Sequence, residues 1–345
     1  MSLHTEIFEQ PHRIESLVFS ARKSVDQVAS AIRQRNIQYV FLAARGTSDN
    51  AGRYANYLLG ARNGLPLALA TPSLFTYYRR PPNLRDALVV GISQSGQSPD
   101  IVSVLQEGRR QRCLTLAITN EPGSPLARSA DFLLNIHAGA EKAVAATKTY
   151  TTQLMSVAML SAALNGRRKD WDDLEKVGGW MRSALEQEDT LARVAQRYRY
   201  MDRTVVLGRG FNYSTAFEWA LKLKELTYII AEPYSSADFA HGPIAMVDSG
   251  FPVLAVVPRG KVFLPMLDAL KQLRADYGAE LVVISNDNRA LSLAQLPLTV
   301  PHDMPEWLSP LVSILPAQLF AYHLTLAKGY NAERPRGLHK VTETR

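Results

Sequence analysis

Two halves of the sequence repeat one order of strand, turn and helix. The segment YVFLAARGTSDNAGRYANYLL begins at Tyr39, and TVVLGRGFNYSTAFEWALKL begins at Thr204. Each segment runs from an apolar stretch through Arg-Gly and a polar turn into a helical pattern. Gly46 and Gly210, which lie within these segments, are 164 positions apart in the chain. A shared order at a fixed spacing predicts two copies of one domain.

The same offset continues beyond the first strand and helix of each half. Gly96 and Gly260 each follow a second apolar stretch and are also 164 positions apart. A third apolar stretch, LTLAITNEP or LVVISNDNR, comes next. Strands that alternate with helices predict an α/β fold in which each domain has a doubly wound parallel sheet flanked by helices. The predicted parts are a helical lead-in at 1–35, a first domain at 36–165, a helical linker at 166–199 and a second domain at 200–345.

The loop SQSGQS, at positions 93–98, joins a predicted buried strand to a predicted helix. The apolar run Ala87–Ile92 precedes the loop, and a helix is expected from Pro99 with Ser98 as its N-cap. Backbone N–H groups at a helix start, together with serine hydroxyls, can surround a phosphate. The alternative is an ordinary polar loop that only caps the helix.

The second half lacks this loop but carries a charged stripe on one helix. At the places equivalent to GTSDN and SQSGQS it reads GFNYS and PRGKV. In STAFEWALKLKELTYI, Glu218, Lys222 and Glu225 fall on one narrow stripe between apolar flanks. Such a stripe favours a cleft in which a carboxylate serves as a base. The alternative is a Glu-Lys pair on the helix surface.

Composition restricts the classes of partner. The net charge of +7 suits an anionic ligand, and the basic residues are interleaved with acidic ones in a sequence without a recognisable nucleic-acid motif. The single cysteine, Cys113, excludes an intrachain disulfide and fits a reducing cytoplasm. Because it opens the apolar run CLTLAIT, Cys113 is interpreted as a strand residue and not as a nucleophile.

Two segments bear on membrane insertion and export. The start of the chain, MSLHTEIFEQPHRIE, carries acids and histidines where a secretory signal needs an apolar core, so no export is expected. Residues 307–327 are uncharged and long enough to span a membrane, but they include prolines and polar side chains. They are interpreted as a loop and a buried helix whose one side carries Leu315, Leu319, His323 and Leu326. We therefore expect no membrane partner.

Several segments together resemble one family. RGTSDN, SQSGQS, GAEKAVAATKTYTTQL, ALKLKELTYIIAEPYSSADFAHGP and ERPRGLHKVTET are similar, in the same order, to the double sugar-isomerase (SIS) module of glucosamine-6-phosphate synthases and amino-sugar-phosphate deaminases. The similarity runs from about residue 35 to the C-terminus. The synthases add a glutaminase domain whose nucleophile is the cysteine after the initiator methionine. Here Ser2 occupies that place and the lead-in is short, so we expect no such domain.

The resemblance implies roles for residues of the first domain. The loop positions Ser93, Gln94, Ser95 and Ser98 would hold the 6-phosphate of a sugar. The turn at Thr47 and Ser48 would contact phosphate and sugar. The segment GAEKAVAATKT would contribute Val144 and Ala145 to substrate binding.

The resemblance also implies the catalytic residues. Glu225 would move a proton between carbons 1 and 2, with Lys222 beside it. His241 would open the sugar ring in the neighbouring subunit, which implies a homodimer with shared active sites. Lys340 would form an imine with the open-chain ketose. These roles are chemically suited to the side chains and need no metal or organic cofactor.

The sequence departs from the family pattern at Gln97, Ser98, Ala146 and Asp238, which would alter pocket shape more than chemistry. The predicted function is deamination of glucosamine 6-phosphate to fructose 6-phosphate and ammonia. The first alternative is a synthase-type isomerase or an isomerase of another phosphosugar. A regulator that binds phosphosugars without catalysis is the alternative of a different class, and binding alone would not require the whole catalytic set.

Overall fold

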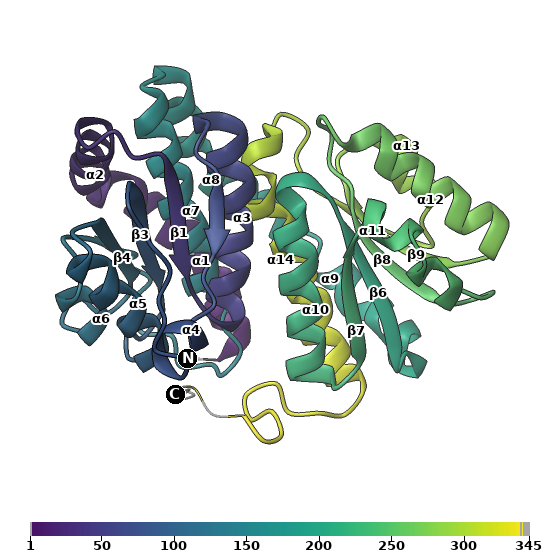
Figure 1. Cartoon of the computed structure of the whole chain (residues 1–345). Helices are drawn as coiled ribbons and strands as arrows, with labels where there is room; N and C mark the ends of the chain where they lie inside the picture. The colour runs from purple at the N-terminus through teal and green to yellow at the C-terminus, as the bar shows by residue number, and fades with distance from the viewer. Residues whose placement is uncertain (1, 339, 341–345) are drawn as a thin grey trace. The chain divides into compact units, whose positions relative to one another are not determined.

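The structure is a computed structural model that describes residues 2–338 and 340, and the chain folds as two compact units. Of the described residues, the first domain comprises His12–Glu141, Lys148–Lys176 and Lys340. The second domain comprises residues 2–11, Lys142–Thr147 and Val177–Leu338. Helices α1 (Leu3–Ser20) and α8 (Arg168–Leu185) contribute residues to both. Each domain is built on one five-stranded parallel sheet, which confirms the predicted fold class (Figure 1).

The first domain has the strand order β2-β1-β3-β4-β5, with every neighbouring pair parallel. All six residues of β3 are buried, because helices cover both faces of the sheet. This confirms the strand expected at Ala87–Ile92. The strands are β1 (Tyr39–Ala43), β2 (Leu67–Leu69), β3 (Ala87–Ile92), β4 (Leu114–Thr119) and β5 (Phe132–Asn135).

Helices α3 and α5 pack against opposite faces of this sheet (Figure 1). Each approaches the sheet closely at a glycine. A Cβ atom on Gly108 of α5 would lie 3.0 Å from Val89, and one on Gly52 of α3 would lie 2.8 Å from Leu42. Val89 and Leu42 point to opposite faces, since the side chains of strands alternate. The helices are α2 (Arg22–Gln34), α3 (Gly46–Asn63), α4 (Ser73–Thr76), α5 (Pro99–Arg110), α6 (Pro125–Arg128) and α7 (Lys148–Asn165).

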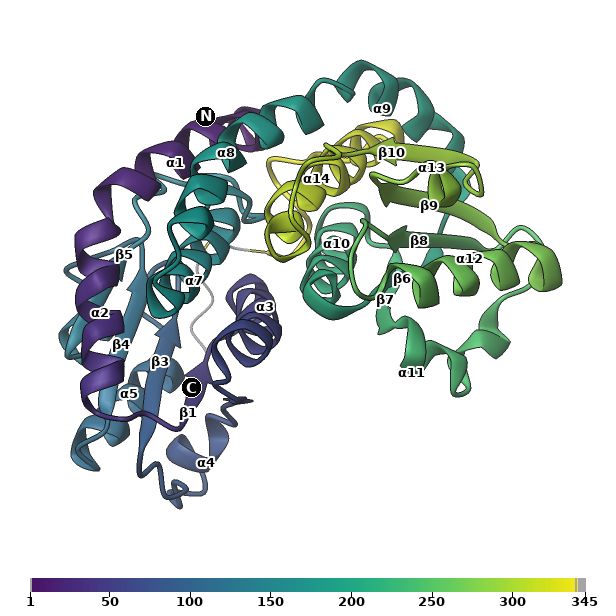
Figure 2. The same ribbon diagram turned by 90° about the horizontal axis from the view of Figure 1, so that it is seen from above.

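The second domain has the strand order β10-β9-β8-β6-β7, again parallel throughout. Helix α12 shares an apolar cluster with β8 and β9, while α10 contacts β6, β7 and α14 (Figure 2). The strands are β6 (Arg203–Gly208), β7 (Ile230–Ser235), β8 (Pro252–Val256), β9 (Glu280–Ser285) and β10 (Leu296–Thr299). The helices are α9 (Glu188–Val194), α10 (Tyr213–Thr227), α11 (Ser236–Ala240), α12 (Phe263–Tyr277), α13 (Asn288–Leu291) and α14 (Ser309–Ala327), with 3-10 turns at Ala195–Tyr200, Gly210–Asn212, Pro243–Met246 and Glu306–Leu308.

The two sheets have the same topology, with β1 and β6 in equivalent positions. Gly46 and Gly210 follow these strands with φ of +52° and +60°, a conformation that glycine adopts without strain. Asn120 and Asn286 follow the equivalent strands β4 and β9. Each asparagine accepts a hydrogen bond from a backbone N–H and donates one to a backbone carbonyl. The repeat in the sequence is therefore a repeat in structure.

The uncharged segment near the C-terminus forms a core helix of the second domain. Its 3-10 turn and α14 are long and apolar enough to cross a membrane, yet 83% of the most apolar stretch is buried in the protein. The helix begins at Ser309, with Pro310 in its first turn. Leu326 is 48% exposed, so the predicted apolar side was wrong at that residue. A helix that is apolar on nearly all sides is typical of a buried position.

The helical linker predicted at 166–199 contains more than one helix. Helix α8 ends at Leu185, α9 covers Glu188–Val194, and a 3-10 turn follows. Helix α7, at Lys148–Asn165, ends where the linker was predicted to begin.

Candidate active site

The SQSGQS loop leaves the carboxyl end of β3 and is folded by its own serines. The Ser93 hydroxyl oxygen accepts a hydrogen bond from the N–H of Gly96 at 3.1 Å, and that of Ser95 accepts one from the N–H of Gln97 at 3.3 Å. The Gln94 carbonyl accepts from Thr119 Oγ1 at 3.2 Å. The two serine bonds fold the loop on itself, and the Thr119 bond holds it on the end of β4.

Gly96 is required at the tip of the loop by two features. Its φ is +61°, and a Cβ atom there would lie 2.1 Å from the Ser124 hydroxyl oxygen. Its carbonyl accepts a hydrogen bond from the N–H of Leu126 at 3.1 Å. The loop therefore lies directly on the start of α6, and any larger residue at this position would displace it.

Helix α5 begins at Pro99, directly after the predicted N-cap residue. Ser98 occupies the N-cap position with an extended backbone, but its side chain makes no capping hydrogen bond. The predicted N-cap residue is therefore confirmed, although its hydroxyl does not cap the helix. Because the Ser98 side chain accepts no hydrogen bond from the first turn of α5, it does not satisfy the backbone N–H groups there. These groups, at the N-terminus of a 12-residue helix, favour an anion.

An ion pair joins the start of α5 to the neighbouring turn after β1. Arg45 Nε lies 2.8 Å from Asp100 Oδ2, and the Asp100 side chain is 2% exposed while that of Arg45 is 53% exposed. The arginine balances a carboxylate that would otherwise repel an anion at the start of α5. Sequence reasoning overlooked Arg45, although the Arg-Gly pair in both repeats, Arg45-Gly46 and Arg209-Gly210, was a usable signal.

The turn at Thr47 and Ser48 forms the first turn of α3. Ser48 is buried, and its hydroxyl oxygen accepts a hydrogen bond from Gln153 Nε2 at 3.0 Å. Gln153 lies on α7, so this bond ties the turn to a second helix. Sequence reasoning did not single out Gln153.

The equivalent loop of the second domain is occupied by a carboxylate of the protein. Glu306 Oε2 accepts a hydrogen bond from the N–H of Lys261 at 2.9 Å, and a Cβ atom on Gly260 would lie 2.0 Å from Glu306 Cδ. The second domain therefore places its own negative group at the position that corresponds to the SQSGQS loop. This contact gives a physical reason for the divergence of the two loops.

The predicted charged stripe on α10 is buried. Lys222 Nζ lies 2.5 Å from Glu225 Oε2 and 3.3 Å from Glu218 Oε1. The side chains of Glu218, Lys222 and Glu225 are 0%, 2% and 24% exposed, so the alternative of a surface pair was wrong. Burial alone would lower the pKa of Lys222, but the carboxylates of Glu225 and Glu218 outweigh it and hold that pKa above its usual value. Lys222 is therefore a fixed cation that orients the partly accessible Glu225.

His241 also lies in the second domain, directly after α11. It occupies the C-cap position of that helix, its backbone N–H donates to the carbonyl of Asp238 at 3.1 Å, and the residue is exposed.

The segment with Val144 and Ala145 is held by the N-terminal helix. Glu6 is fully buried, and its carboxylate accepts hydrogen bonds from the N–H groups of Lys142 at 2.6 Å and Ala143 at 3.2 Å. Ala145 is buried and Val144 is half-buried. Glu6 was not expected from the sequence, and a lone acid in an amphipathic helix gives no signal of such a role.

The tail lysine belongs to the first domain. Lys340 Nζ donates to Glu141 Oε2 at 2.8 Å, and Glu141 is completely buried. The sequence-predicted residues thus fall into two sets. The serine loop, the Thr47-Ser48 turn and Lys340 belong to the first domain, and Lys222, Glu225, His241, Val144 and Ala145 belong to the second.

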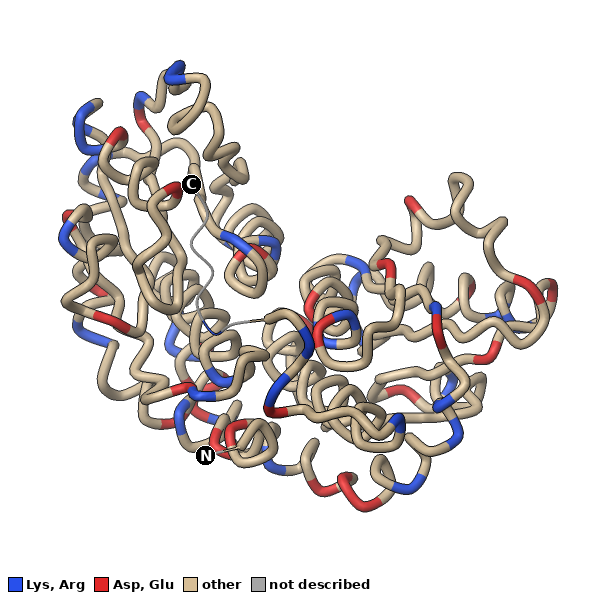
Figure 3. Tube along the Cα trace, turned by 90° about the horizontal axis from the view of Figure 1, so that it is seen from below, with Lys and Arg blue, Asp and Glu red and all other residues tan. Residues whose placement is uncertain are grey.

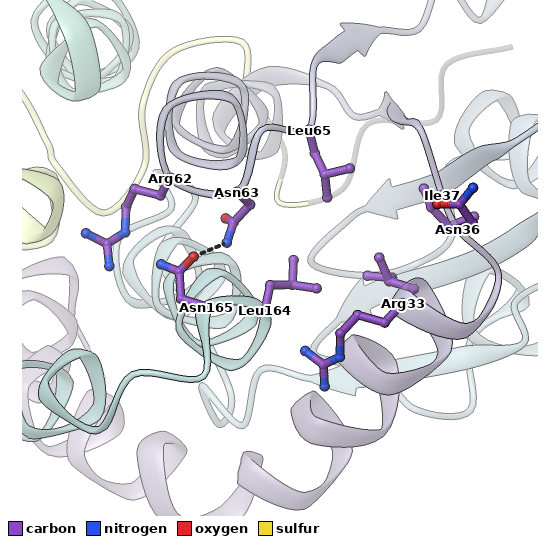
Figure 4. Close-up of a pocket in the computed structure, with 9 residues that line it drawn as sticks. Arg33, Asn36, Ile37, Arg62, Asn63, Leu65, Leu164 and Asn165 are labelled. Atoms are coloured by element: carbon purple, nitrogen blue, oxygen red, sulfur yellow. Dashed lines mark hydrogen bonds between the residues drawn. The ribbon is translucent and has the colours of Figure 1, made fainter.

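A separate hollow of about 370 Å³ lies at the opposite edge of the first sheet, beside the starts of β1 and β2 (Figure 4). Polar side chains that line the hollow form hydrogen bonds that join the ends of neighbouring helices. Arg33 donates to the Ala163 carbonyl, and Asn63 donates to the side chain of Asn165. We assign this hollow no catalytic role, because ligands of parallel sheets bind at the carboxyl ends of strands.

Three further observations bear on the chemistry. Cys113 lies directly before β4, donates to the Leu84 carbonyl at 3.0 Å, and has a pKa raised by burial, as expected of an inert thiol. Among the residues that the structure describes, no group of three or more His, Cys, Asp or Glu side chains is placed to hold a metal ion. Basic and acidic residues are interleaved along the helices (Figure 3).

Comparisons with known proteins agree with this architecture. The SIS domain profile matches residues 33–163 and 198–328. The chain is 33% identical over 338 residues to the glutamine–fructose-6-phosphate aminotransferase (isomerizing) of Aquifex aeolicus, and 36% identical over 338 residues to that of Methanothermobacter thermautotrophicus. Each alignment covers 97% of this chain but 56% of the relative.

A solved structure extends the similarity. The C-terminal domain of glucosamine-fructose-6-phosphate aminotransferase from Francisella tularensis superposes with a TM-score of 0.88 at 28% identity, over 96% of this chain and 98% of that one. The glucosamine-6-phosphate deaminase of Thermotoga maritima, at 20% identity and a TM-score of 0.80, shares the fold. With its duplicated sheets and the two matched regions, the chain belongs to the SIS domain family and carries two copies of that domain.

Proposed function

We propose that this protein is an enzyme that interconverts the aldose and ketose forms of an amino-sugar phosphate. The observation that carries the proposal is the Lys222–Glu225 pair, in which a carboxylate that is 24% exposed is oriented by a buried ammonium 2.5 Å away. A partly accessible carboxylate on a rigid helix can take a proton from one carbon and return it to the next. A protein that only bound the sugar would gain nothing from this arrangement.

The proposed reaction divides between the two sets of residues. The serine loop and the start of α5 bind the phosphate through neutral donors and the helix end. Glu225 removes the proton from carbon 2 of the open-chain aldose and delivers it to carbon 1. His241 opens the ring by proton transfer at the ring oxygen, for which an imidazole is suited near neutral pH. In the deaminating direction Lys340 attacks the carbon-2 imine that this proton transfer produces and displaces ammonia, and water then releases fructose 6-phosphate from the lysine. In the aminating direction Lys340 condenses with the ketose carbonyl to form an imine and water.

We propose glucosamine 6-phosphate as the substrate and deamination to fructose 6-phosphate and ammonia as the net reaction. The second candidate is the aminating direction of a synthase-type isomerase, which the 33–36% identity to isomerizing aminotransferases favours. The deaminating and the aminating reaction both use the same proton transfer at Glu225. The exposed His241 supports a homodimer, since a ring-opening residue on the surface of one subunit can complete the site of another.

A panel of sugar phosphates tests the proposal. Purified protein is incubated with glucosamine 6-phosphate, or with fructose 6-phosphate and ammonium, and ammonia and hexose phosphates are measured. Release of ammonia with fructose 6-phosphate supports the deaminase, and formation of glucosamine 6-phosphate supports the second candidate. Tight binding of phosphosugars without any turnover would support a regulator and contradict an enzyme.

A further inference from the structure

Glu141 is a buried carboxylate fixed at the start of α7. The residue is buried, and its Oε1 accepts from the N–H of Thr149 at 3.1 Å while its Oε2 accepts from Thr149 Oγ1 at 2.8 Å. Thr149 is the second residue of α7, so the carboxylate lies at the positive end of an 18-residue helix. Both contacts restrict the rotation of the side chain.

The partner of this carboxylate is the amine that the proposed chemistry requires. Lys340 Nζ lies 2.8 Å from Glu141 Oε2, and the lysine side chain is 25% exposed. A buried carboxylate is stable only when it is paired and hydrogen-bonded, and the C-terminal tail supplies the positive charge. The pair joins positions 199 residues apart, so it places the tail lysine in the first domain.

The same helix connects this pair to the predicted substrate turn. Gln153 lies four residues after Thr149, on the same face of α7 and about 6 Å further along its axis. Its side chain donates to Ser48 at 3.0 Å. One helix therefore holds the partner of Lys340 and the partner of the turn that is predicted to contact phosphate and sugar.

We propose that Glu141 is the positioning residue of Lys340, and that it takes one proton from the ammonium when the amine attacks the ketose carbonyl. The nitrogen then forms a bond to carbon 2, and its two remaining hydrogens leave with the carbonyl oxygen as water. The proton on Glu141 returns to the imine nitrogen. This inference rests on the proposed function, because it assigns a role within imine formation.

Borohydride trapping tests the role of Glu141. Wild type, Glu141→Gln and the matched control Asp173→Asn are mixed with saturating fructose 6-phosphate and sodium borohydride, and the adduct on Lys340 is followed by peptide mass spectrometry. Asp173 accepts from Lys169 at 2.9 Å in the first domain, so its substitution removes a lysine pair outside the site. We expect adduct formation to slow at least tenfold in Glu141→Gln alone, with the affinity for fructose 6-phosphate, measured by calorimetry, unchanged.

Each outcome decides one question. A wild-type rate of trapping in Glu141→Gln overturns the role of Glu141 and leaves the proposed function intact. Trapping that is absent from Lys340 of the wild type overturns the imine step itself. If Glu141→Gln does not fold, competitive acetylation of the wild type replaces it. Lys340 should then react more slowly than the exposed Lys23, and equal rates would overturn the inference.

Discussion

Replacing Glu225 by Gln removes a proton acceptor while it preserves the size of the side chain. The buried Lys222 keeps Glu218 as a charged partner at 3.3 Å, so the substitution leaves no unpaired ammonium in the core. The loss of a general base lowers a rate by about 10² to 10⁴, which corresponds to a barrier higher by about 3 to 5 kcal/mol. We therefore expect kcat to fall by that factor while KM for the sugar phosphate changes little.

The assay is steady-state turnover of glucosamine 6-phosphate, with Glu218→Gln as the matched control on the same helix. Glu218 is completely buried and contacts the same lysine. We therefore expect Glu218→Gln to lower the melting temperature more than Glu225→Gln does, and to lower kcat less. The serine loop belongs to the first domain, so phosphate binding should survive in both variants. A Glu225→Gln variant with near wild-type kcat would refute the assignment of the base and the reasoning from burial on α10.

Further predictions address the loop and the assembly. Ser95→Asp places a fixed negative charge in the loop and should weaken fructose 6-phosphate binding severely in calorimetry, and unchanged affinity would reduce the loop to a structural element. Gly96→Ala should lower the free energy of unfolding by roughly 1–3 kcal/mol, because Ala is strained at positive φ and its Cβ meets Ser124. Gly123→Ala, where an added Cβ has open space, is the control for that denaturation experiment. His241→Ala chains mixed with Glu225→Gln chains should recover activity in hybrid dimers, and failure despite proven subunit exchange would show that each chain completes its own site.

The sequence predicted features that depend on local pattern. Strand β3 was recognisable because a strand covered on both faces is apolar throughout, and the repeat was visible because both halves keep equivalent glycines. The stripe on α10 followed from helical periodicity, which brings Glu218, Lys222 and Glu225 to one face. These inferences needed no knowledge of the contacts between distant segments.

Other features required the tertiary structure. The Lys340–Glu141 pair joins residues far apart in the chain, and no periodicity connects them. The occupation of the second loop by Glu306 depends on a turn 45 residues later. Ser98 occupies the N-cap position that the sequence predicted, but its side chain makes no capping hydrogen bond.

Hydrogen exchange at the substrate carbons tests the central claim most directly. Wild-type protein is incubated with glucosamine 6-phosphate in heavy water, and the hexose phosphates are analysed by NMR. If Glu225 moves a proton between carbons 1 and 2, and if that proton exchanges with solvent while it is on the partly exposed carboxylate, the wild type should introduce deuterium at one of these carbons, and Glu225→Gln should not. Recovery of unconverted, unlabelled sugar phosphate from the wild type would contradict the account.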